Sequence, residues 1–365
     1  MNRKVAIIGS GNWGTTVSKL IAENLNSKTE ELADYDNIVE MYVYEEILPD
    51  NSKLSDFINK YRQNIKYLPN HILPDNVHAE PDILKAVENA TDIVLVTPHQ
   101  FAVNLLTRIS KTIKRRKDEV YFINLSKGVH FDPLEKKIWR VTEIAKEILD
   151  LPEDNIAALS GPNVAKDIAA ELFTETVIAS TSDETVRRFQ TLFEKPYFVV
   201  RSSNDVAGVE FGGALKNIVA IAAGFIDGFK LGSNSKATII RIGMEEMYKF
   251  AKIFETDVNP ASRETFNGPA FLGDIMTTCY GGRNRLYGEA LGVCFNQDLP
   301  PVNIDVFEKS VLKGQIVQGF KTTFDVYTFL DNIGIIDEYP LFKLVYDALQ
   351  KEENPKDKFI DIINL

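Results

Sequence analysis

The sequence predicts an α/β fold in which a doubly wound parallel sheet, covered on both faces by helices, is followed by an all-helical part. Up to about residue 202, short β-branched runs alternate with longer helical patterns, as in repeated βαβ units. Beyond that point the strand signals fade and helical periodicity remains. A chain of 365 residues suits two domains, which we expect at residues 1–202 and 203–365.

The expected elements follow from the length and spacing of the apolar runs. The run Ile93–Val96 does not alternate with polar residues, as is typical of a central strand with both faces buried. Strands are expected at Val5–Ile8, Met41–Tyr44, Ile93–Thr97, Tyr121–Leu125, Ala157–Ser160, Thr176–Ser180 and Tyr197–Val200. Helices of the second part are expected at Val206–Phe229, Lys236–Phe254, Leu286–Phe295, Phe320–Asp331 and Leu341–Leu349.

Charge and composition argue against several classes of protein. A net charge of −11 at pH 7 would repel nucleic acids and anionic membranes. The two cysteines, Cys279 and Cys294, form no paired motif, and the four histidines lack the spacing of metal ligands. We therefore expect no metal, no nucleic-acid partner and a reducing compartment.

Neither apolar segment of note predicts export or a membrane span. The run Val5–Ile8 ends at Gly9, far short of the apolar region of a signal peptide. The stretch Ile218–Ile226 is too short to cross a bilayer, and Asp227 follows it. A cytoplasmic protein with a buried helix in its second half is the expectation.

A glycine-rich loop joins the first strand to the first helix. It consists of Gly9, Ser10, Gly11, Asn12, Trp13 and Gly14, which form a Gly-x-Gly-x-x-Gly pattern. Such glycines permit a tight turn, close approach of a pyrophosphate and close packing of helix on strand. The helix N-terminus then faces the anion. Strand, loop and helix in this order predict a Rossmann-type dinucleotide site rather than a merely structural turn.

Two acids, Glu45 and Glu46, follow the second expected strand. An acid there suits a free ribose 2′-hydroxyl, whereas a 2′-phosphate would require arginine or lysine. This favours NAD over NADP. The alternative is that both are only solvated loop acids.

Residues just after the carboxyl ends of parallel strands are the next candidates, because ligands of open α/β sheets bind there. Phe101 follows the strand at Ile93–Thr97 and could form an apolar wall against a cofactor, or simply pack. Lys127 follows the strand at Tyr121–Leu125 and could face a substrate.

Lys216 and Asn217 interrupt a helix whose other residues are apolar or small almost all round. A buried ammonium is costly unless it is paired or deprotonated, so Lys216 is expected to have a partner and a lowered pKa. Those properties suit a general acid/base. The alternative is a lysine that reaches solvent or forms a structural ion pair.

A second cluster lies near Gly281 and Gly282, which precede an expected helix. Arg283 stands where a phosphate would meet both a guanidinium and helix N–H groups. Asp274 could orient Lys216 or cap a helix. A Gly-Gly-Arg turn alone is usually a surface feature, so its meaning depends on the glycine loop and the buried lysine.

Together these motifs resemble those of the cytosolic NAD-dependent glycerol-3-phosphate dehydrogenase family. They occur in the family's order across nearly the whole chain, and several are long and uncommon. The matching segments are Gly9–Gly14, Tyr67–Pro69, Leu73–Pro74, Pro98–Phe101, Ser126–Val129, Ser160–Asn163, Ala214–Asn217 and Thr277–Arg285.

The resemblance implies a homodimer that reversibly reduces dihydroxyacetone phosphate to glycerol 3-phosphate with NADH. It makes Lys216 the proton donor, with Asn217, Asp274 and Thr278 around it. Lys127, Arg283 and Asn284 would contact the substrate, with the phosphate held by Arg283 and Asn284. Besides the glycine loop, the residues implied to contact NAD are Tyr44, Phe101, Lys127, Ala165, Arg283 and Gln318.

Two residues depart from the family pattern. Tyr44 replaces a common phenylalanine, which should be harmless, and Ile316 occupies a position that is often lysine, which puts a basic contact near the cofactor in doubt. Two other functions are compatible with parts of this pattern. They are a hydroxyacid or phosphogluconate-type dehydrogenase, since fold does not fix substrate, and a non-catalytic NAD-binding sensor. The segment Thr277–Arg285 argues against the first. The joint presence of Lys216, Asn217, Asp274 and Arg283 argues against the second.

Overall fold

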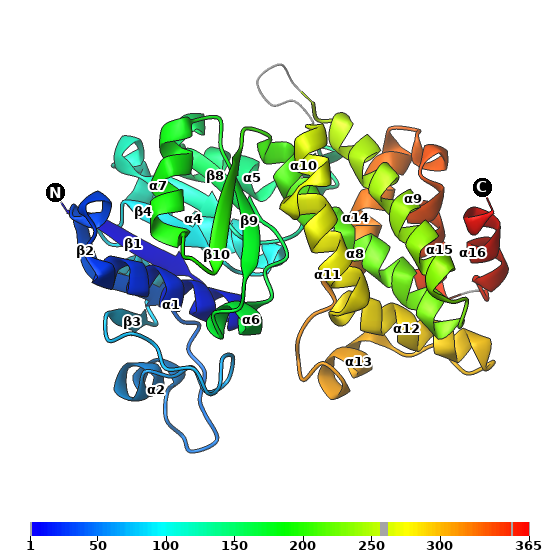
Figure 1. Ribbon diagram of the computed structural model, residues 1–365, viewed down its shortest axis with the longest axis horizontal. Helices are drawn as coiled ribbons and strands as arrows, with labels where there is room; N and C mark the ends of the chain where they lie inside the picture. The colour runs from blue at the N-terminus through cyan, green and yellow to red at the C-terminus, as the bar shows by residue number, and fades with distance from the viewer. Residues whose placement is uncertain (1, 256–261, 352, 365) are drawn as a thin grey trace. The chain divides into compact units, whose positions relative to one another are not determined.

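The structure is a computed structural model that describes residues 2–255, 262–351 and 353–364 (Figure 1). The chain divides into two compact units. Unit 1 comprises Met1–Lys127 and Val141–Val206, and unit 2 comprises Gly128–Arg140 and Ala207–Leu365. Each unit is described by itself.

Unit 1 is built on one eight-stranded sheet with the spatial order β10-β9-β8-β5-β4-β1-β2-β3. The order 3-2-1-4-5 of its first strands is that of a dinucleotide-binding sheet, and it reverses between β1 and β4. The strands are β1 (Arg3–Ile8), β2 (Tyr35–Tyr42), β3 (Val77–Glu80), β4 (Asp92–Leu95), β5 (Tyr121–Asn124), β8 (Ile156–Ser160), β9 (Thr174–Ala179) and β10 (Phe198–Ser203).

Helices cover both faces of this sheet (Figure 1). On one face α1 (Asn12–Ser27) contacts α6 (Ala165–Ala169) and α7 (Asp183–Phe193). On the other, α4 (Ala102–Lys114) contacts α3 (Ile83–Ala86) and α5 (Val141–Leu149). The central strands are buried throughout, which confirms the interpretation of their unbroken apolar runs.

The sheet departs from the expected parallel arrangement at one edge. Strand β9 pairs antiparallel with β8, and β10 is parallel to β9, so both run against the other strands. The five-residue helix α6 between β8 and β9 spans only about 8 Å, less than half the length of a strand and its turns. It is too short to carry the chain back to the starting edge, so the chain returns antiparallel.

The described residues of unit 2 are helical apart from one hairpin. The core helix is α8 (Val206–Gly228). By length and composition alone it could cross a membrane, but its 18-residue apolar window is 100% buried inside the protein. The other helices are α9 (Ser233–Lys252), α10 (Arg263–Asn267), the π-helical turn η5 (Pro269–Gly273), α11 (Asp274–Tyr280), α12 (Arg283–Asn296), α13 (Ile304–Ser310), α14 (Gln318–Asn332), α15 (Pro340–Gln350) and α16 (Lys356–Ile363). These helices enclose a core rich in phenylalanine.

Several elements were absent from the sequence prediction: the short helices α10, α11, α13 and α16, one hairpin and one edge strand. The hairpin β6 (His130–Asp132) and β7 (Lys137–Trp139) belongs to unit 2 and contacts α14, although it lies within the first part of the chain. Strand β3 alternates buried Val77 and Ala79 with polar neighbours at the sheet edge, so it lacks a continuous apolar run.

Candidate active site

The glycine loop lies between β1 and α1, at the edge where the strand order reverses. Gly9 has φ +130°, and a Cβ there would lie 2.5 Å from the Val96 carbonyl oxygen. A Cβ on Gly14 would lie 2.1 Å from the Gly9 oxygen. These two glycines fix the shape of the turn, as predicted. At Gly11, by contrast, no described atom lies within 4 Å of the Cβ position, so the loop is open there.

The start of α1 fits an anionic dinucleotide. Gly11 is the N-cap, and the first turn carries no acidic side chain among the described residues. The Oδ1 atom of Asn12 and the Nε1 atom of Trp13 are buried without a hydrogen-bond partner in the described part of the chain. Open N–H groups, a positive helix end and the free indole N–H of Trp13 together suit a pyrophosphate, whose oxygens accept hydrogen bonds.

Two aromatic side chains lie at the same edge of the sheet. Tyr44 follows β2 and is 74% exposed, and Phe101 ends the short helix η2 (His99–Phe101) after β4 and is 49% exposed. Large exposed aromatic side chains at the carboxyl ends of β2 and β4 are available to a ligand. Their contact with NAD stays a prediction.

The acids after β2 are bonded within unit 1 rather than solvated. Glu45 accepts hydrogen bonds from the Ser55 N–H at 3.2 Å and from its hydroxyl at 2.6 Å. Glu46 accepts one from the Tyr67 hydroxyl at 2.6 Å and pairs with Lys66. Both carboxylates are half-buried and anchor the chain after β2. Ribose recognition by either one stays a prediction.

Lys127 and Ala165 both lie near the carboxyl ends of β5 and β8. The Lys127 Nζ atom donates to the Gly161 carbonyl oxygen at 3.0 Å. Ala165 begins α6, and its carbonyl oxygen accepts from the Thr16 hydroxyl of α1 at 3.2 Å. Both residues are therefore held at the edge that carries the glycine loop.

In unit 2, Lys216 is buried in α8 and forms an ion pair with Asp274 at the start of α11. Their relative exposures are 5% and 1%, so two charges are withdrawn from water together. A buried charge requires such a counter-charge. The predicted partner of Lys216 is confirmed. The Thr278 hydroxyl donates to the Asp274 carbonyl oxygen at 2.7 Å, one turn back along α11.

Asn217 joins a second polar array beside this pair. Its Oδ1 atom accepts from the Asn284 Nδ2 atom at 2.7 Å, and the Asn284 Oδ1 atom accepts from the Gly319 N–H at 2.9 Å. The Nδ2 group of Asn217 is buried and has no hydrogen-bond partner among the described residues. An unsatisfied buried donor is costly, so it marks a place where a ligand oxygen would be bound.

Arg283 is the first residue of the 14-residue helix α12, next to Asn284. The N-cap, Gly282, has φ +89°, a conformation that favours glycine, and this sharp turn exposes the helix N-terminus. Burial lowers the pKa of the Arg283 guanidinium, and the charge of Glu308 opposes this effect. The guanidinium and the N–H groups of α12 together suit a phosphate group.

The described geometry can be compared with known proteins. The model of the NAD-dependent glycerol-3-phosphate dehydrogenase N-terminus matches residues 4–186, and that of its C-terminus matches residues 205–359. The chain belongs to this dehydrogenase family. Cytoplasmic glycerol-3-phosphate dehydrogenase [NAD(+)] of Homo sapiens is 38% identical over 98% of this chain and 97% of its own length.

Two further members of the dehydrogenase family are similar to this chain over nearly its whole length. Glycerol-3-phosphate dehydrogenase [NAD(+)] of Cuphea lanceolata is 39% identical over 94% of this chain and 88% of its own. The structure of glycerol-3-phosphate dehydrogenase from Saccharomyces cerevisiae matches with a TM-score of 0.85, at 34% identity over 100% of both chains. NAD is the cofactor of the family, and the open glycine loop of unit 1 fits it.

For a dehydrogenase of this family, the predicted site residues form two groups. Unit 2 brings together Lys216 with Asp274 and Thr278, and Asn217 with Asn284, beside Arg283. Gln318 begins α14 and precedes Gly319, which bonds to Asn284. Unit 1 carries the glycine loop, Tyr44, Phe101, Lys127 and Ala165. Their individual roles stay predictions.

Sequence reasoning missed residues that support these groups. The backbone N–H of Gly319 completes the Asn217–Asn284 array, and Arg285 pairs with Asp227 of α8 at 2.8 Å. A usable signal existed in the four-residue spacing of Gly224 with Gly228 and of Gly288 with Gly292, which permits two helix backbones to touch.

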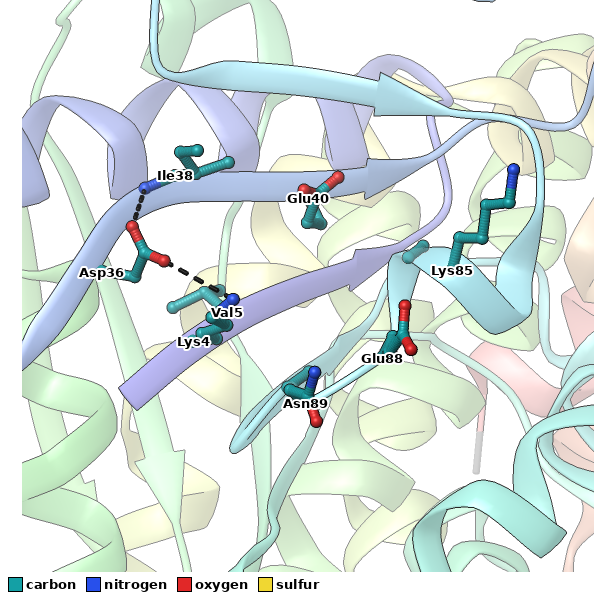
Figure 2. A pocket seen from close by; sticks show the side chains of 10 residues that line it. Lys4, Val5, Asp36, Ile38, Glu40, Lys85, Glu88 and Asn89 are labelled. Carbon is teal, nitrogen blue, oxygen red and sulfur yellow. Dashed lines mark hydrogen bonds and ion pairs between the residues drawn. The ribbon is translucent and has the colours of Figure 1, made fainter. Parts of the chain in front are cut away.

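A separate pocket lies at the amino-terminal edge of the sheet, away from the glycine loop (Figure 2). Its lining mixes charges of both signs, including Lys4 paired with Asp36 at 3.6 Å, and Glu40, Lys85 and Glu88. None of the predicted site residues lines it, so it has no part in the site.

Proposed function

We propose that the protein catalyses reversible reduction of dihydroxyacetone phosphate to sn-glycerol 3-phosphate, with Lys216 as proton donor and acceptor. This proposal rests on the buried Lys216–Asp274 pair, which lies beside the Asn217–Asn284 array at the start of α12. It places a proton donor near a site suited to an anion. The family relationship supports the same reaction.

Substrate binding depends mainly on the start of α12. Arg283 offers paired N–H donors to phosphate oxygens, and the N–H groups of α12 add to them. Asn284 is held by Asn217 at 2.7 Å, so it is oriented before substrate arrives. In this proposal the free Nδ2 group of Asn217 donates to a substrate oxygen. Lys127 supplies a further contact.

Lys216 transfers the proton in this proposal. When bound, NADH supplies the hydride that the substrate carbonyl carbon receives. The Lys216 ammonium donates a proton to the carbonyl oxygen, which becomes the hydroxyl of glycerol 3-phosphate. In the reverse direction neutral Lys216 takes that proton back. The Asp274 carboxylate pairs with the Nζ atom, holds it in place and offsets the positive charge in a buried setting.

In unit 1, the glycine loop and the N-terminus of α1 hold the cofactor pyrophosphate. Tyr44 and Phe101 flank the cofactor, and Ala165 contributes a further contact. Gln318, which belongs to unit 2, is also proposed to contact NAD. Ile316 is half-buried just before α14, so no basic side chain is present at this position. The NAD affinity therefore depends on the remaining contacts.

A homodimer and a cytoplasmic location are further parts of the proposal. The name of the human relative supports the location, and resemblance to the family supports the dimer. Sedimentation equilibrium of the purified chain would give about twice the monomer mass. A monomer that is fully active would contradict the dimer and leave the reaction unaffected.

The reaction is tested by following NADH oxidation at 340 nm with three compounds. Dihydroxyacetone phosphate should be reduced rapidly, and unphosphorylated dihydroxyacetone should be a poor substrate. 6-Phosphogluconate with NAD should give no NADH, which separates this function from a phosphogluconate-type dehydrogenase. Failure to oxidise NADH with dihydroxyacetone phosphate, while NADH still binds, would contradict the proposal and favour a sensor.

A further inference from the structure

Helices α8 and α12 touch backbone to backbone. A Cβ on Gly224 of α8 would lie 2.1 Å from the Arg285 carbonyl oxygen, and a Cβ on Gly288 of α12 would lie 2.1 Å from the Ile221 carbonyl oxygen. Gly292 approaches Phe225 in the same way, at 2.9 Å. Any larger side chain at these glycines would push the two helices apart.

The contacts also show the direction and register of the two helices. Asn217 meets Asn284, Ile221 meets Gly288, and Phe225 meets Gly292. Both partners advance by four residues at each step, so the helices run parallel along matched rows. Glycine rows permit this close approach, but they have no side chains that interlock. The register must therefore be fixed by groups at the ends of the contact.

Arg285 provides such a group outside the predicted site. Its Nε atom donates to the Asp227 Oδ2 atom at 2.8 Å, and its NH2 group donates to Glu289 at 2.8 Å. Asp227 also accepts from Lys236 of α9 at 2.7 Å. The side chains of Arg285 and Asp227 are 17% and 23% exposed, so the pair is largely shielded from water.

This pair connects the two halves of the unit 2 site. Asp227 lies eleven residues after Lys216, which is three turns of α8 and about 16 Å along its axis. Arg285 lies two residues after Arg283 and one after Asn284. A shift of α12 along the glycine rows would therefore change the spacing between the phosphate-binding groups and the proton donor.

We propose that Arg285, held by Asp227, is a positioning residue that fixes the register of α12 on α8. In doing so it sets the distance between the phosphate contacts, Arg283 and Asn284, and the proton donor, Lys216. The inference rests on the proposed function of these three residues. Arg285 itself touches neither substrate nor cofactor.

The test compares Arg285→Gln with the parent on dihydroxyacetone phosphate and on dihydroxyacetone. We expect kcat/KM with the phosphorylated substrate to fall by roughly 10- to 100-fold, because a displacement of about 1 Å in a site can cost that much. The loss should lie mainly in KM. With dihydroxyacetone, and in the affinity for NADH, the variant should stay within about twofold of the parent, since no phosphate is involved.

Four further variants separate positioning from general stability. Asp227→Asn should reproduce the Arg285→Gln defect, and Arg285→Lys should retain most activity because it keeps a cation opposite Asp227. Lys236→Met is the matched control, since it removes the other cation on Asp227 but leaves α12 paired, and it should leave KM for the substrate unchanged. In the double variant Arg283→Ala/Arg285→Gln, the second change should add little.

Equal loss on both substrates, or full additivity in the double variant, would overturn the inference. So would a KM defect in Lys236→Met as large as that in Arg285→Gln. If the parent itself does not reduce dihydroxyacetone phosphate, the proposed function fails, and calorimetry with inorganic phosphate decides the inference. Phosphate binding that is weaker in Arg285→Gln but equal to that of the parent in Lys236→Met would support positioning. Unchanged phosphate binding in Arg285→Gln would overturn it.

Discussion

Among the single residues of the site, Lys216 is strongly constrained by burial. An ammonium that is 5% exposed in an apolar helix requires a counter-charge, and Asp274 supplies it from another helix. The apolar pattern around Lys216 predicts that a partner exists. It does not identify Asp274, which is 58 residues away and reaches Lys216 only through the fold.

Lys216→Met tests the proton donor. The substitution keeps the bulk of the side chain and removes its proton, so kcat should fall by about 10²- to 10⁴-fold, as for the loss of a general acid. Binding of NADH should persist, because the glycine loop belongs to unit 1. Stopped-flow turnover and quenching of tryptophan fluorescence by NADH would measure the two quantities. Turnover near the parental rate would show that Lys216 is structural and make Lys127 the first alternative donor.

At the scale of elements, the glycine loop offers a contrast between two of its positions. Gly14→Ala places a Cβ 2.1 Å from the Gly9 oxygen, so it should lower stability by about 1 to 3 kcal/mol, as overpacking does, and weaken NADH binding. Gly11→Ala meets open space, so its melting temperature should match that of the parent while NADH affinity drops. Calorimetry and fluorescence titration would measure both variants. Normal NADH affinity in Gly11→Ala would show that the pyrophosphate does not approach this residue.

Glu246 links α9 to α15 and makes this contact sensitive to pH. Its carboxylate accepts the N–H groups of Leu341 at 2.7 Å and Phe342 at 2.9 Å, at the start of α15. Burial raises the pKa of Glu246 from 4.5 to about 7, and these two hydrogen bonds oppose the rise. Because the folded protein holds this proton more tightly than the unfolded chain, stability is lost as pH rises from about 4.5 to 7.

The size of this effect follows from the pKa difference. A rise of this extent corresponds to about 3 kcal/mol between pH 4.5 and pH 7.5. Glu246→Gln removes the titration, so its stability relative to the parent should improve over that range. Urea unfolding at both pH values would measure the difference. A difference between parent and variant that does not change with pH would contradict the assignment to Glu246.

At the scale of the whole molecule, the sequence predicts most of the architecture but not its exceptions. Apolar runs identify the central strands because those strands are buried on both faces. Strand β3 is missed because only Val77 and Ala79 are apolar, and the antiparallel return of β9 is missed because run patterns carry no direction.

The site is predictable to a similar extent. Local sequence patterns indicate three candidates. The glycine loop has a Gly-x-Gly-x-x-Gly spacing, Lys216 lies in an otherwise apolar helix, and Arg283 follows two glycines at the start of a helix. The Asn217–Asn284–Gly319 array and the Arg285–Asp227 pair join distant segments, so local patterns cannot reveal them.

The preference for NADH over NADPH can be tested on the unmodified protein. Glu45 and Glu46 follow β2, and their carboxylates should disfavour a 2′-phosphate, so NADH should be preferred strongly over NADPH. Lys66, a cation close to these acids, is already engaged in an ion pair with Glu46. Steady-state kinetics with both cofactors would measure the preference. Comparable kcat/KM values for NADH and NADPH would contradict it.

We expect the start of α12 to bind the phosphate of the substrate beside Lys216, and Arg283→Ala tests this binding. Two charge-assisted hydrogen bonds of about 1.5 to 3 kcal/mol each predict a loss of about 10²- to 10⁴-fold in kcat/KM with dihydroxyacetone phosphate. With dihydroxyacetone, parent and variant should be alike. Added phosphite should accelerate the parent on that truncated substrate and not the variant, because binding energy at the phosphate site organises the reacting groups. Equal fractional loss on both substrates, with phosphite activation intact, would contradict the account.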